Sequence, residues 1–241
     1  MGKVYFISDA HLGLGSKAVE REKESRLLRF CDHIKDDASQ LFIVGDLFDA
    51  WFEYTTVIPK GFHRLFAKLE ELVGRGIIVH YLAGNHDFWM KDFFRDELGV
   101  HMYNDPLAIT IDGKRVFIHH GDGLAGKDTG YKILKRILRN PVNIWLYRWL
   151  HPDIGLALAR STSRKSRHHT SAKDYGERDG MLNLAKQKFS EGVDIVIMGH
   201  RHQPARQELG TGTYINLGDW ITHNTYAVLA DGTISLHEWK D

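Results

Sequence analysis

The sequence predicts an α/β protein whose last part is mixed or antiparallel β-structure. Five short apolar runs, each bounded by Gly, Asp or Asn, have the composition of buried strands. Charged amphipathic segments with helical periodicity separate the early runs. After the last run the chain continues in short alternating stretches with Gly-rich turns. We therefore expect alternating strands and helices followed by further strands, which is an α/β (α+β) fold.

The first hundred residues predict three strands and three helices. The helix over 20–36 is indicated by apolar residues on one face, and the next helix ends where Gly74 and Gly76 follow it. In chain order we expect a strand over 3–8, a helix over 20–36, a strand over 41–44, a helix over 62–73, a strand over 77–82 and a helix over 89–98.

The remaining residues predict a hairpin, one more helix and a series of strands, interrupted by a helical insertion. The Asp112-Gly113 turn joins two strands of the hairpin. The expected elements are strands over 107–111 and 115–119, a helix over 176–189, and strands over 194–198, 204–208, 213–216, 225–229 and 233–238. Residues 127–173 predict three short helical pieces separated at Asn140-Pro141 and His151-Pro152. We expect them to form a cap inserted into a single domain that spans residues 1–241.

Composition and charge fit an ordinary globular protein with one unusual segment. The chain has 241 residues, of which 43% are hydrophobic and 26% charged. Its single cysteine, Cys31, forms no intrachain disulfide, which favours a reducing compartment, the cytoplasm. No leader-like segment precedes the first strand, and no apolar run has the length needed to span a bilayer. Residues 127–173 carry eleven Lys and Arg against two acids, so we expect an anionic partner there.

Metal-ligand residues follow all five apolar runs. Because functional groups gather beyond the carboxyl ends of strands in α/β sheets, we expect one shared site. Oxygen and nitrogen donors without thiolate suit two divalent ions, Mn²⁺ first, with Fe or Zn as alternatives, better than Ca²⁺. The expected ligands are Asp9, His11, Asp46, Asn85, His120, His200 and His202.

Three further residues of the same motifs have expected catalytic roles. Two metal ions can clamp a phosphate and lower the pKa of a bound water, which predicts phosphoester hydrolysis. His86 would stabilise the phosphoryl charge or protonate the leaving group. Asp87 and Asp122 would orient imidazoles of the ligands.

The complete motif set resembles that of the calcineurin-like metallophosphoesterases. The resemblance covers the chain except for the cap, and it implies a four-layer αββα sandwich. It also implies that Asp9, His11, Asp46 and His202 hold one metal ion, and that Asp46, Asn85, His120 and His200 hold the other.

A narrower resemblance concerns the substrate. The segments 45–51, 121–124 and 128–131, together with the cap, are similar to the UDP-2,3-diacylglucosamine diphosphatases of lipid A synthesis. That resemblance implies cleavage to 2,3-diacylglucosamine 1-phosphate and UMP, at the cytoplasmic face of the inner membrane, by a peripheral protein. The implied substrate contacts are Asp128, Tyr131, Arg160, Ser163, Arg164 and Arg167. The chain departs from the pattern at His86, where the best-known members carry Arg, which indicates another branch or another substrate.

Alternative functions remain open at this point. The apolar and basic residues of the cap fit an anionic glycolipid and a membrane surface, although an apolar helix face is also typical of a cap core. His86 is the usual residue in general or nucleotide phosphodiesterases. A nuclease is a weaker alternative, because the Leu and Trp content of the cap fits a lipid better than a nucleic acid. A binding scaffold would have lost ligands, and all seven are present. No obligate protein partner is inferred.

Overall fold

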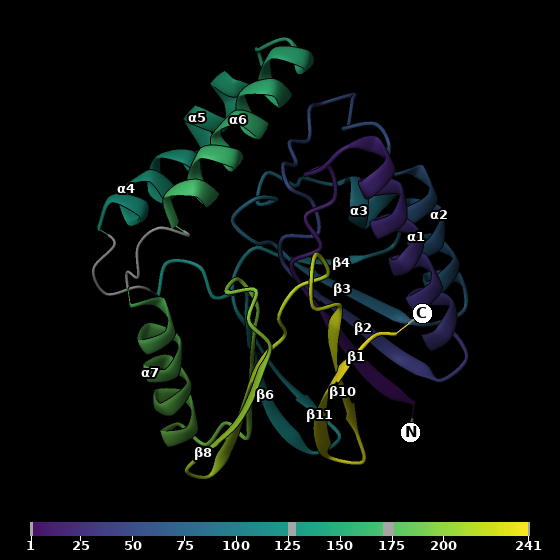
Figure 1. Cartoon of the computed structure of the whole chain (residues 1–241), viewed down its shortest axis with the longest axis vertical. Coiled ribbons are helices and arrows are strands. Elements are labelled where there is room, and N and C mark those ends of the chain that lie inside the picture. Colours follow the sequence, from purple (N-terminus) through teal and green to yellow (C-terminus); the bar gives the residue numbers. More distant parts are fainter. Residues whose placement is uncertain (1, 125–128, 171–175, 241) are drawn as a thin grey trace.

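A computed structural model shows two β-sheets packed face to face, with helices on both outer faces and a helical cap above them (Figure 1). The structure describes residues 2–124, 129–170 and 176–240, without the side chains of residues 129, 131, 132, 164–170 and 177.

The first sheet has the strand order β11-β10-β1-β2-β3-β4 in the described part of the chain. Its strands β1 to β4 run parallel, and β10 and β11 extend the sheet in antiparallel pairing. The bounds are β1 (Lys3–Ile7), β2 (Ala38–Val44), β3 (Ile78–Leu82), β4 (His101–Tyr103), β10 (Thr225–Ala230) and β11 (Thr233–Glu238).

The second sheet has the order β5-β6-β7-β9-β8. Its three inner strands are parallel and both edge strands pair antiparallel. The bounds are β5 (Leu107–Ile111), β6 (Lys114–His119), β7 (Ile195–Met198), β8 (Ala205–Leu209) and β9 (Gly212–Asn216).

Alternation along the strands fills the layers on both sides of the first sheet. Val4 and Phe6 of β1 belong to the apolar core between the two sheets, where Phe6 stacks on Phe42 with ring centroids 5.0 Å apart. Tyr5 and Ile7 of the same strand face the helices α1 (Lys17–Ile34), α2 (His63–Gly74) and α3 (Phe93–Asp96). Helix α7 (Glu177–Ser190) covers the second sheet. The expected αββα sandwich is therefore confirmed.

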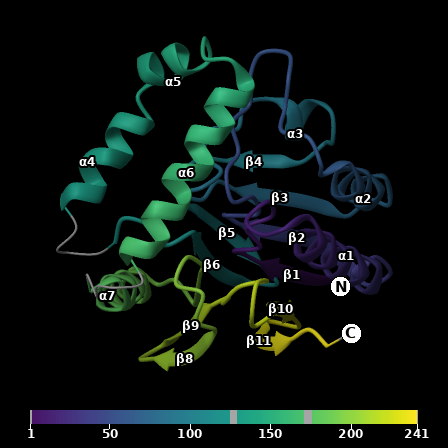
Figure 2. The same ribbon diagram turned by 45° about the horizontal axis from the view of Figure 1, so that its top comes forward.

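Three helices occupy the segment expected to form the cap: α4 (Thr129–Leu138), α5 (Pro141–Tyr147) and α6 (Pro152–Thr170). In Figure 2, α5 lies at the outer end of the cap, and α4 and α6 run from it toward the rest of the molecule. In the chain the three helices lie between β6 and α7. The two breaks fall at the expected Asn-Pro and His-Pro pairs, because proline is accommodated in the first turn of a helix. The side chain of Asn140 caps α5 by accepting a hydrogen bond from the backbone N–H of Val142 at 2.9 Å. Helix α6 is longer than the short piece expected.

The predicted helix over 89–98 was wrong at its start, and β4 was not predicted. Only Phe93–Asp96 is helical. The Glu53 carboxylate accepts hydrogen bonds from the backbone N–H groups of Lys91, Asp92 and Phe93, and Trp89 forms a bridge with Phe52. These contacts come from a segment almost forty residues away, so helical periodicity in 89–98 could not reveal them.

Among the described helices, none combines the length and apolar character that crossing a bilayer requires.

Candidate metal centre

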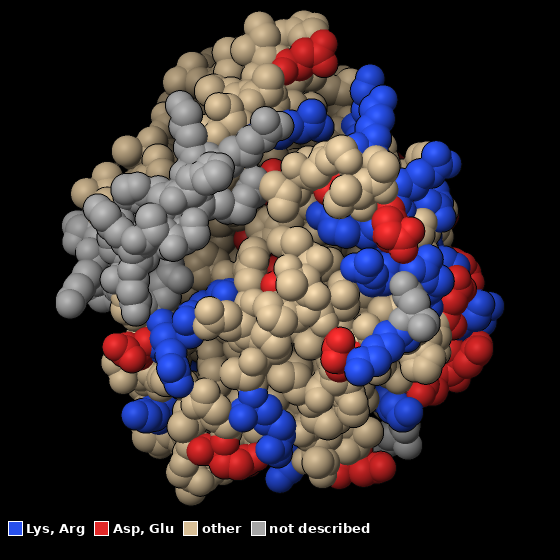
Figure 3. All heavy atoms as spheres, in the orientation of Figure 1, with Lys and Arg blue, Asp and Glu red and all other residues tan. Residues whose placement is uncertain are grey.

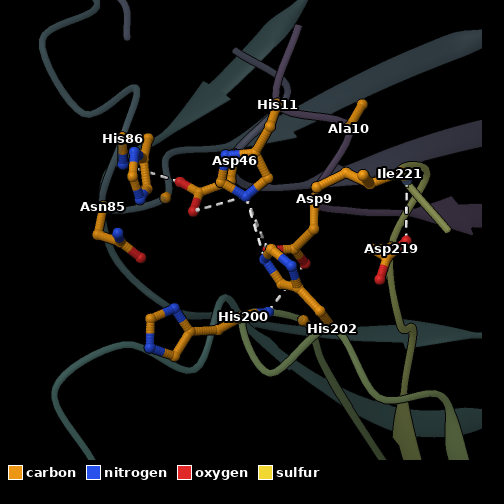
Figure 4. A network of polar contacts seen from close by, with 12 residues as sticks. Asp9, Ala10, His11, Asp46, Asn85, His86, His200, His202, Asp219 and Ile221 are labelled. Atoms are coloured by element: carbon orange, nitrogen blue, oxygen red, sulfur yellow. Dashed lines mark hydrogen bonds and ion pairs between the residues drawn. The ribbon is translucent and has the colours of Figure 1, made fainter. Parts of the chain in front are cut away.

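Five loops bring all seven expected ligands to one place. The loops follow β1, β2 and β3 of the first sheet and β6 and β7 of the second, all at the carboxyl ends of parallel strands. Figure 4 shows Asp9, His11, Asp46, Asn85, His200 and His202 around a common space. The predicted clustering therefore has a simple cause, which is the shared direction of these strands.

Backbone strain is concentrated at this site. Of the eight non-glycine residues with positive φ among the described residues, five are expected ligands: Asp9 (55°), His11 (44°), Asp46 (53°), His200 (70°) and His202 (54°). Each costs about 1–2 kcal/mol relative to the right-handed region. Local contacts stabilise the conformation: the Lys23 ammonium, for example, donates to the carbonyl oxygens of Ala10 and His11 at 3.1 and 2.7 Å. Strain of this kind is typical of a functional site.

Asp9, His11 and His202 form the first ligand group. One ligand atom from each lies within 4.8 Å of the others. The Nε2 atoms of His11 and His202 are 3.1 Å apart, and Asp9 Oδ1 lies 3.3 Å from His202 Nε2. Two atoms that each bind one ion at about 2.1 Å are separated by about 3.0–3.4 Å. Among the described residues, buried Asp9 Oδ1 finds no hydrogen-bond donor. The ligand atoms of Asp9, His11 and His202 therefore fit a divalent cation.

Asp46, His120 and His200 form the second group, with ligand atoms again within 4.8 Å. His120 Nδ1 donates to the carbonyl oxygen of Val44 at 2.8 Å, which directs Nε2 toward Asp46 Oδ2 at 3.3 Å and Asn85 Oδ1 at 3.1 Å. A backbone carbonyl behind a ligating imidazole is the usual way to fix its tautomer. This second group also fits a divalent cation.

Asp46 lies between the two groups. Its Oδ2 is 3.3 Å from His120 Nε2 and 3.7 Å from His11 Nε2, while Oδ1 accepts a hydrogen bond from the His86 backbone N–H at 2.8 Å. Burial acts to raise the pKa of Asp46, but the neighbouring imidazoles of His120 and His86 hold it well below its usual range. An ionised carboxylate between two cation sites is suited to bridge them.

Comparison with known proteins agrees with this geometry. A family model described as calcineurin-like phosphoesterase matches residues 2–204. The chain belongs to this family. It is 35% identical to a UDP-2,3-diacylglucosamine hydrolase from Porphyromonas gingivalis, in an alignment that covers 99% of this chain and 98% of that protein. A protein of the same name from Pseudomonas putida is 32% identical, with 90% of each chain covered. Among solved structures, an archaeal phosphodiesterase has a TM-score of 0.51 at 15% identity, covers 98% of this chain and shares the fold.

Asp49 is a residue of this calcineurin-like phosphoesterase that the sequence interpretation missed. It is buried, and its Oδ1 lies 3.6 Å from His11 Nδ1, on the ring side opposite the ligand group. A carboxylate behind a metal-binding imidazole orients the ring and raises its basicity. The available signal was the spacing in Asp46-Leu-Phe-Asp49, which repeats a carboxylate three residues after Asp46.

His86 lies beside the first ligand group of the phosphoesterase. Its ring meets that of His11 edge-on, with centroids 4.8 Å apart, and it forms a possible ligand group with His11 and Asp46. His86 Nδ1 is 3.0 Å from the carbonyl oxygen of Asp49 and 3.0 Å from Ser163 Oγ. Burial lowers the pKa of His86. The structure therefore holds this imidazole in place from both the core and the cap.

The surroundings of Asp87 differ from those expected. Its carboxylate accepts hydrogen bonds from the backbone N–H groups of Leu47 and Gly84 at 2.8 and 2.7 Å and from the Tyr81 hydroxyl at 2.5 Å. Burial raises its pKa to about 6. The hydrogen bonds that the structure gives to Asp87 thus join the loops after β2 and β3, and among the described residues none of them comes from an imidazole. Residue spacing in the sequence predicted that Asp87 lies near the ligands, but it did not predict which groups bind its carboxylate.

Asp122 connects the core to the cap. Its carboxylate forms an ion pair with Lys135 of α4, with Nζ 2.5 Å from Oδ2. Burial would raise the pKa of Asp122, yet the charges of His120 and Lys135 hold it below its usual range. Asp122, which was expected to orient an imidazole, therefore binds a residue of the cap.

The expected substrate contacts are placed only in part. Ser163 is buried, and its hydroxyl contacts Asp49 Oδ1 at 3.1 Å as well as His86, while Arg160 is exposed on the same helix. Asp128 lies outside the described residues, as do the side chains of Tyr131, Arg164 and Arg167. Among the expected substrate contacts whose side chains the structure describes, Ser163 alone forms hydrogen bonds with residues of the metal centre.

Replacing Ser163 with Ala is expected to lower kcat about 10-fold with metal content unchanged, because His86 loses the hydrogen bond that orients it from the cap. Ser161→Ala, at an exposed position on the same helix, is the matched control. Ser163→Thr keeps a hydroxyl and should recover much of the rate. Equal rates for Ser163→Ala and the wild type would show that the contact does not matter.

Proposed function

We propose that this protein is a metal-dependent diphosphatase that converts UDP-2,3-diacylglucosamine into 2,3-diacylglucosamine 1-phosphate and UMP. The main support is the 35% identity, over nearly the full length of both chains, to a relative named for hydrolysis of this substrate. A complete set of seven donors in ligand geometry supports hydrolysis rather than a scaffold role.

The expected ligands divide between two ions. Asp9, His11, Asp46 and His202 would hold one. Asp46, Asn85, His120 and His200 would hold the other. When bound, such ions polarise the phosphate and lower the pKa of a bound water. We infer Mn²⁺ as the resident ion, with Fe or Zn also compatible with imidazole and carboxylate donors, and metal analysis of purified protein tests this.

The residues of the chain position the reacting groups. Attack at the phosphorus next to uridine breaks the bond to the bridging oxygen, which leaves with the sugar 1-phosphate. His86, which contacts the Asp49 carbonyl oxygen and the Ser163 hydroxyl, would in its protonated form stabilise the phosphoryl charge or give a proton to that oxygen. The ion pair between Lys135 and Asp122 attaches helix α4 to the loop that follows β6.

The cap supplies a surface suited to acyl chains and to the cytoplasmic face of the inner membrane. In Figure 3 the upper part of the molecule, where α5 and α6 lie, shows mainly uncharged residues, with acidic and basic residues among them. Large apolar side chains are exposed on the three cap helices and on the connection between α5 and α6: Ile133, Leu134, Ile137, Val142, Trp145, Leu146, Trp149, Leu150, Ile154 and Leu158. Basic residues of the cap would face anionic headgroups, which favours a glycolipid and a membrane over nucleic acid.

Removing two exposed tryptophans should weaken membrane binding. Trp145 and Trp149 are 55% and 76% exposed. Their replacement by Ala is expected to reduce partition onto anionic phospholipid vesicles by at least about 10-fold, since each indole contributes about 1.5–3 kcal/mol on burial. Sedimentation with vesicles measures this. The control is the double replacement of the exposed residues Val19 and Val57 with Ala. If both double variants bind vesicles equally well, the cap does not contact the membrane.

A general or nucleotide phosphodiesterase is the second candidate. It is favoured by His86, which stands where the best-known diphosphatases of this kind carry Arg. The test is turnover of the Mn-loaded protein on UDP-2,3-diacylglucosamine, with UDP-glucosamine lacking acyl chains as the control. Strong preference for the acylated substrate supports the diphosphatase. Equal turnover of both, or turnover only of the compound without acyl chains, supports the phosphodiesterase.

A further inference from the structure

Helix α4 presents two cations to the side of the metal centre that carries Asn85 and His120. Lys135 and Arg139 are four residues apart, so they lie on the same helix face. Lys135 is paired with Asp122, two residues after His120. Arg139 directly follows the last residue of α4, and its Nη2 is 3.4 Å from the carbonyl oxygen of Gly84, the residue before Asn85. Both cations therefore flank one edge of the site.

Arg139 is the cation whose donors are poorly used. A guanidinium has five N–H donors. The contacts of the Arg139 guanidinium within the described residues are the long one to Gly84 and the face of the Phe88 ring, whose centroid lies 5.2 Å from the guanidinium carbon. Its Nε is buried and has no acceptor among those residues. A buried donor without a partner is costly, so an ordered guanidinium in this state indicates a site for an anion.

The position of Arg139 limits which anion it can meet. The carbonyl group that it contacts belongs to Gly84, whose Cα packs against the bridging carboxylate: a Cβ there would lie 2.1 Å from Asp46 Oδ1. Neighbouring phosphates of a diphosphate share one oxygen. A group that binds the second phosphate must therefore lie close to the ligands of the first, and Arg139 contacts Gly84, the residue that precedes Asn85 and packs against Asp46.

We propose that Arg139 is a substrate-binding residue that takes the phosphate next to the one held at the metal ligands, and so makes the site prefer a diphosphate over a monophosphate. The planar fork of Arg matches two phosphate oxygens at once. The proposal deepens the proposed function and rests on it for the choice of a uridine nucleotide. It does not depend on the acyl chains.

Binding of UDP and UMP to the Mn-loaded protein, measured by titration calorimetry, tests the proposal. The wild type is expected to bind UDP more tightly than UMP. Arg139→Gln should weaken UDP binding about 10- to 100-fold, as expected for a lost charge-assisted hydrogen bond, and leave UMP binding nearly unchanged. Arg139→Lys, which keeps the charge without the fork, should fall between them. Arg136→Gln, an exposed arginine on the same helix, should match the wild type.

The outcomes separate the possible roles of Arg139. If Arg139→Gln weakens UDP and UMP equally, or lowers metal content, Arg139 supports the loop and binds no second phosphate, and the proposal is overturned. A wild type that binds both nucleotides equally also overturns it. Failure of the protein to hydrolyse UDP-2,3-diacylglucosamine, together with a preference for UDP that depends on Arg139, would instead reject the lipid substrate and keep the diphosphate site.

Discussion

Replacing Asp46 with Asn should abolish hydrolysis and reduce the number of bound metal ions from two to one or none. Asp46 Oδ2 is the oxygen that lies near both His11 Nε2 and His120 Nε2. The amide keeps the shape of the side chain but removes the charge that two neighbouring cations share. Metal ions contribute several kcal/mol of transition-state stabilisation, so kcat should fall about 1000-fold or more.

Metal stoichiometry by elemental analysis and turnover on the same preparation measure this effect. Asp105→Asn, the same chemical change at an exposed position, is the control and should keep two ions and full activity. Thermal unfolding in the presence of a chelator shows that both variants fold. Two tightly bound ions in Asp46→Asn would contradict the bridging role.

The clustering of the expected metal ligands could be predicted because it depends on local pattern and a general rule of topology. Each of the loops that hold them follows a parallel strand, so a short apolar run followed by Asp, Asn or His was sufficient to locate them. The helix over 89–98 could not be predicted correctly, because the Glu53 carboxylate decides where that helix begins.

The orienting residues were harder to predict, because their roles exist only through contacts between distant segments. Ser163 and His86 are 77 residues apart, and Ser163 and Asp49 are 114 apart. Spacing in the sequence suggested that Asp87 serves the ligands, but its hydrogen bonds go to Leu47, Gly84 and Tyr81.

The position of the cap depends in the same way on long-range contacts. The Trp89 indole donates to the carbonyl oxygen of Leu138 at 3.0 Å, and its ring stacks on that of Tyr147. Gly155 of α6 lies so close to the core that a Cβ there would meet the Tyr54 hydroxyl at 2.1 Å. An insertion of helices was predictable from the two breaks, one at Asn140-Pro141 and one at His151-Pro152. Its contact with the metal-binding loops was not, since neither surface has a sequence signal of its own.

Replacing Gly84 with Ala should also lower the rate strongly, although less than the change at Asp46, and although it adds only a single methyl group. The new Cβ would lie 2.1 Å from Asp46 Oδ1 and 2.6 Å from the Asp46 backbone nitrogen, both held by loops that cannot move freely. Asp46 Oδ1 already accepts the His86 N–H, so the carboxylate must leave its position between the two ligand groups. A displacement of about 1 Å at a catalytic site costs about 100-fold in rate, and overpacking costs about 1–3 kcal/mol of stability.

Gly74→Ala is the matched control, since a Cβ at Gly74, in α2, would meet no heavy atom within 4 Å. We expect it to keep wild-type turnover and two ions, whereas Gly84→Ala should lose about 100-fold in kcat and bind the metal more weakly. Gly84 needs no left-handed backbone, in contrast to Gly45 with φ 83°, so a loss in Gly84→Ala reports crowding of the bridging carboxylate and not a strained main chain. Full activity in Gly84→Ala would mean that Asp46 can shift without cost, and a carboxylate that mobile could not hold two ions in fixed positions.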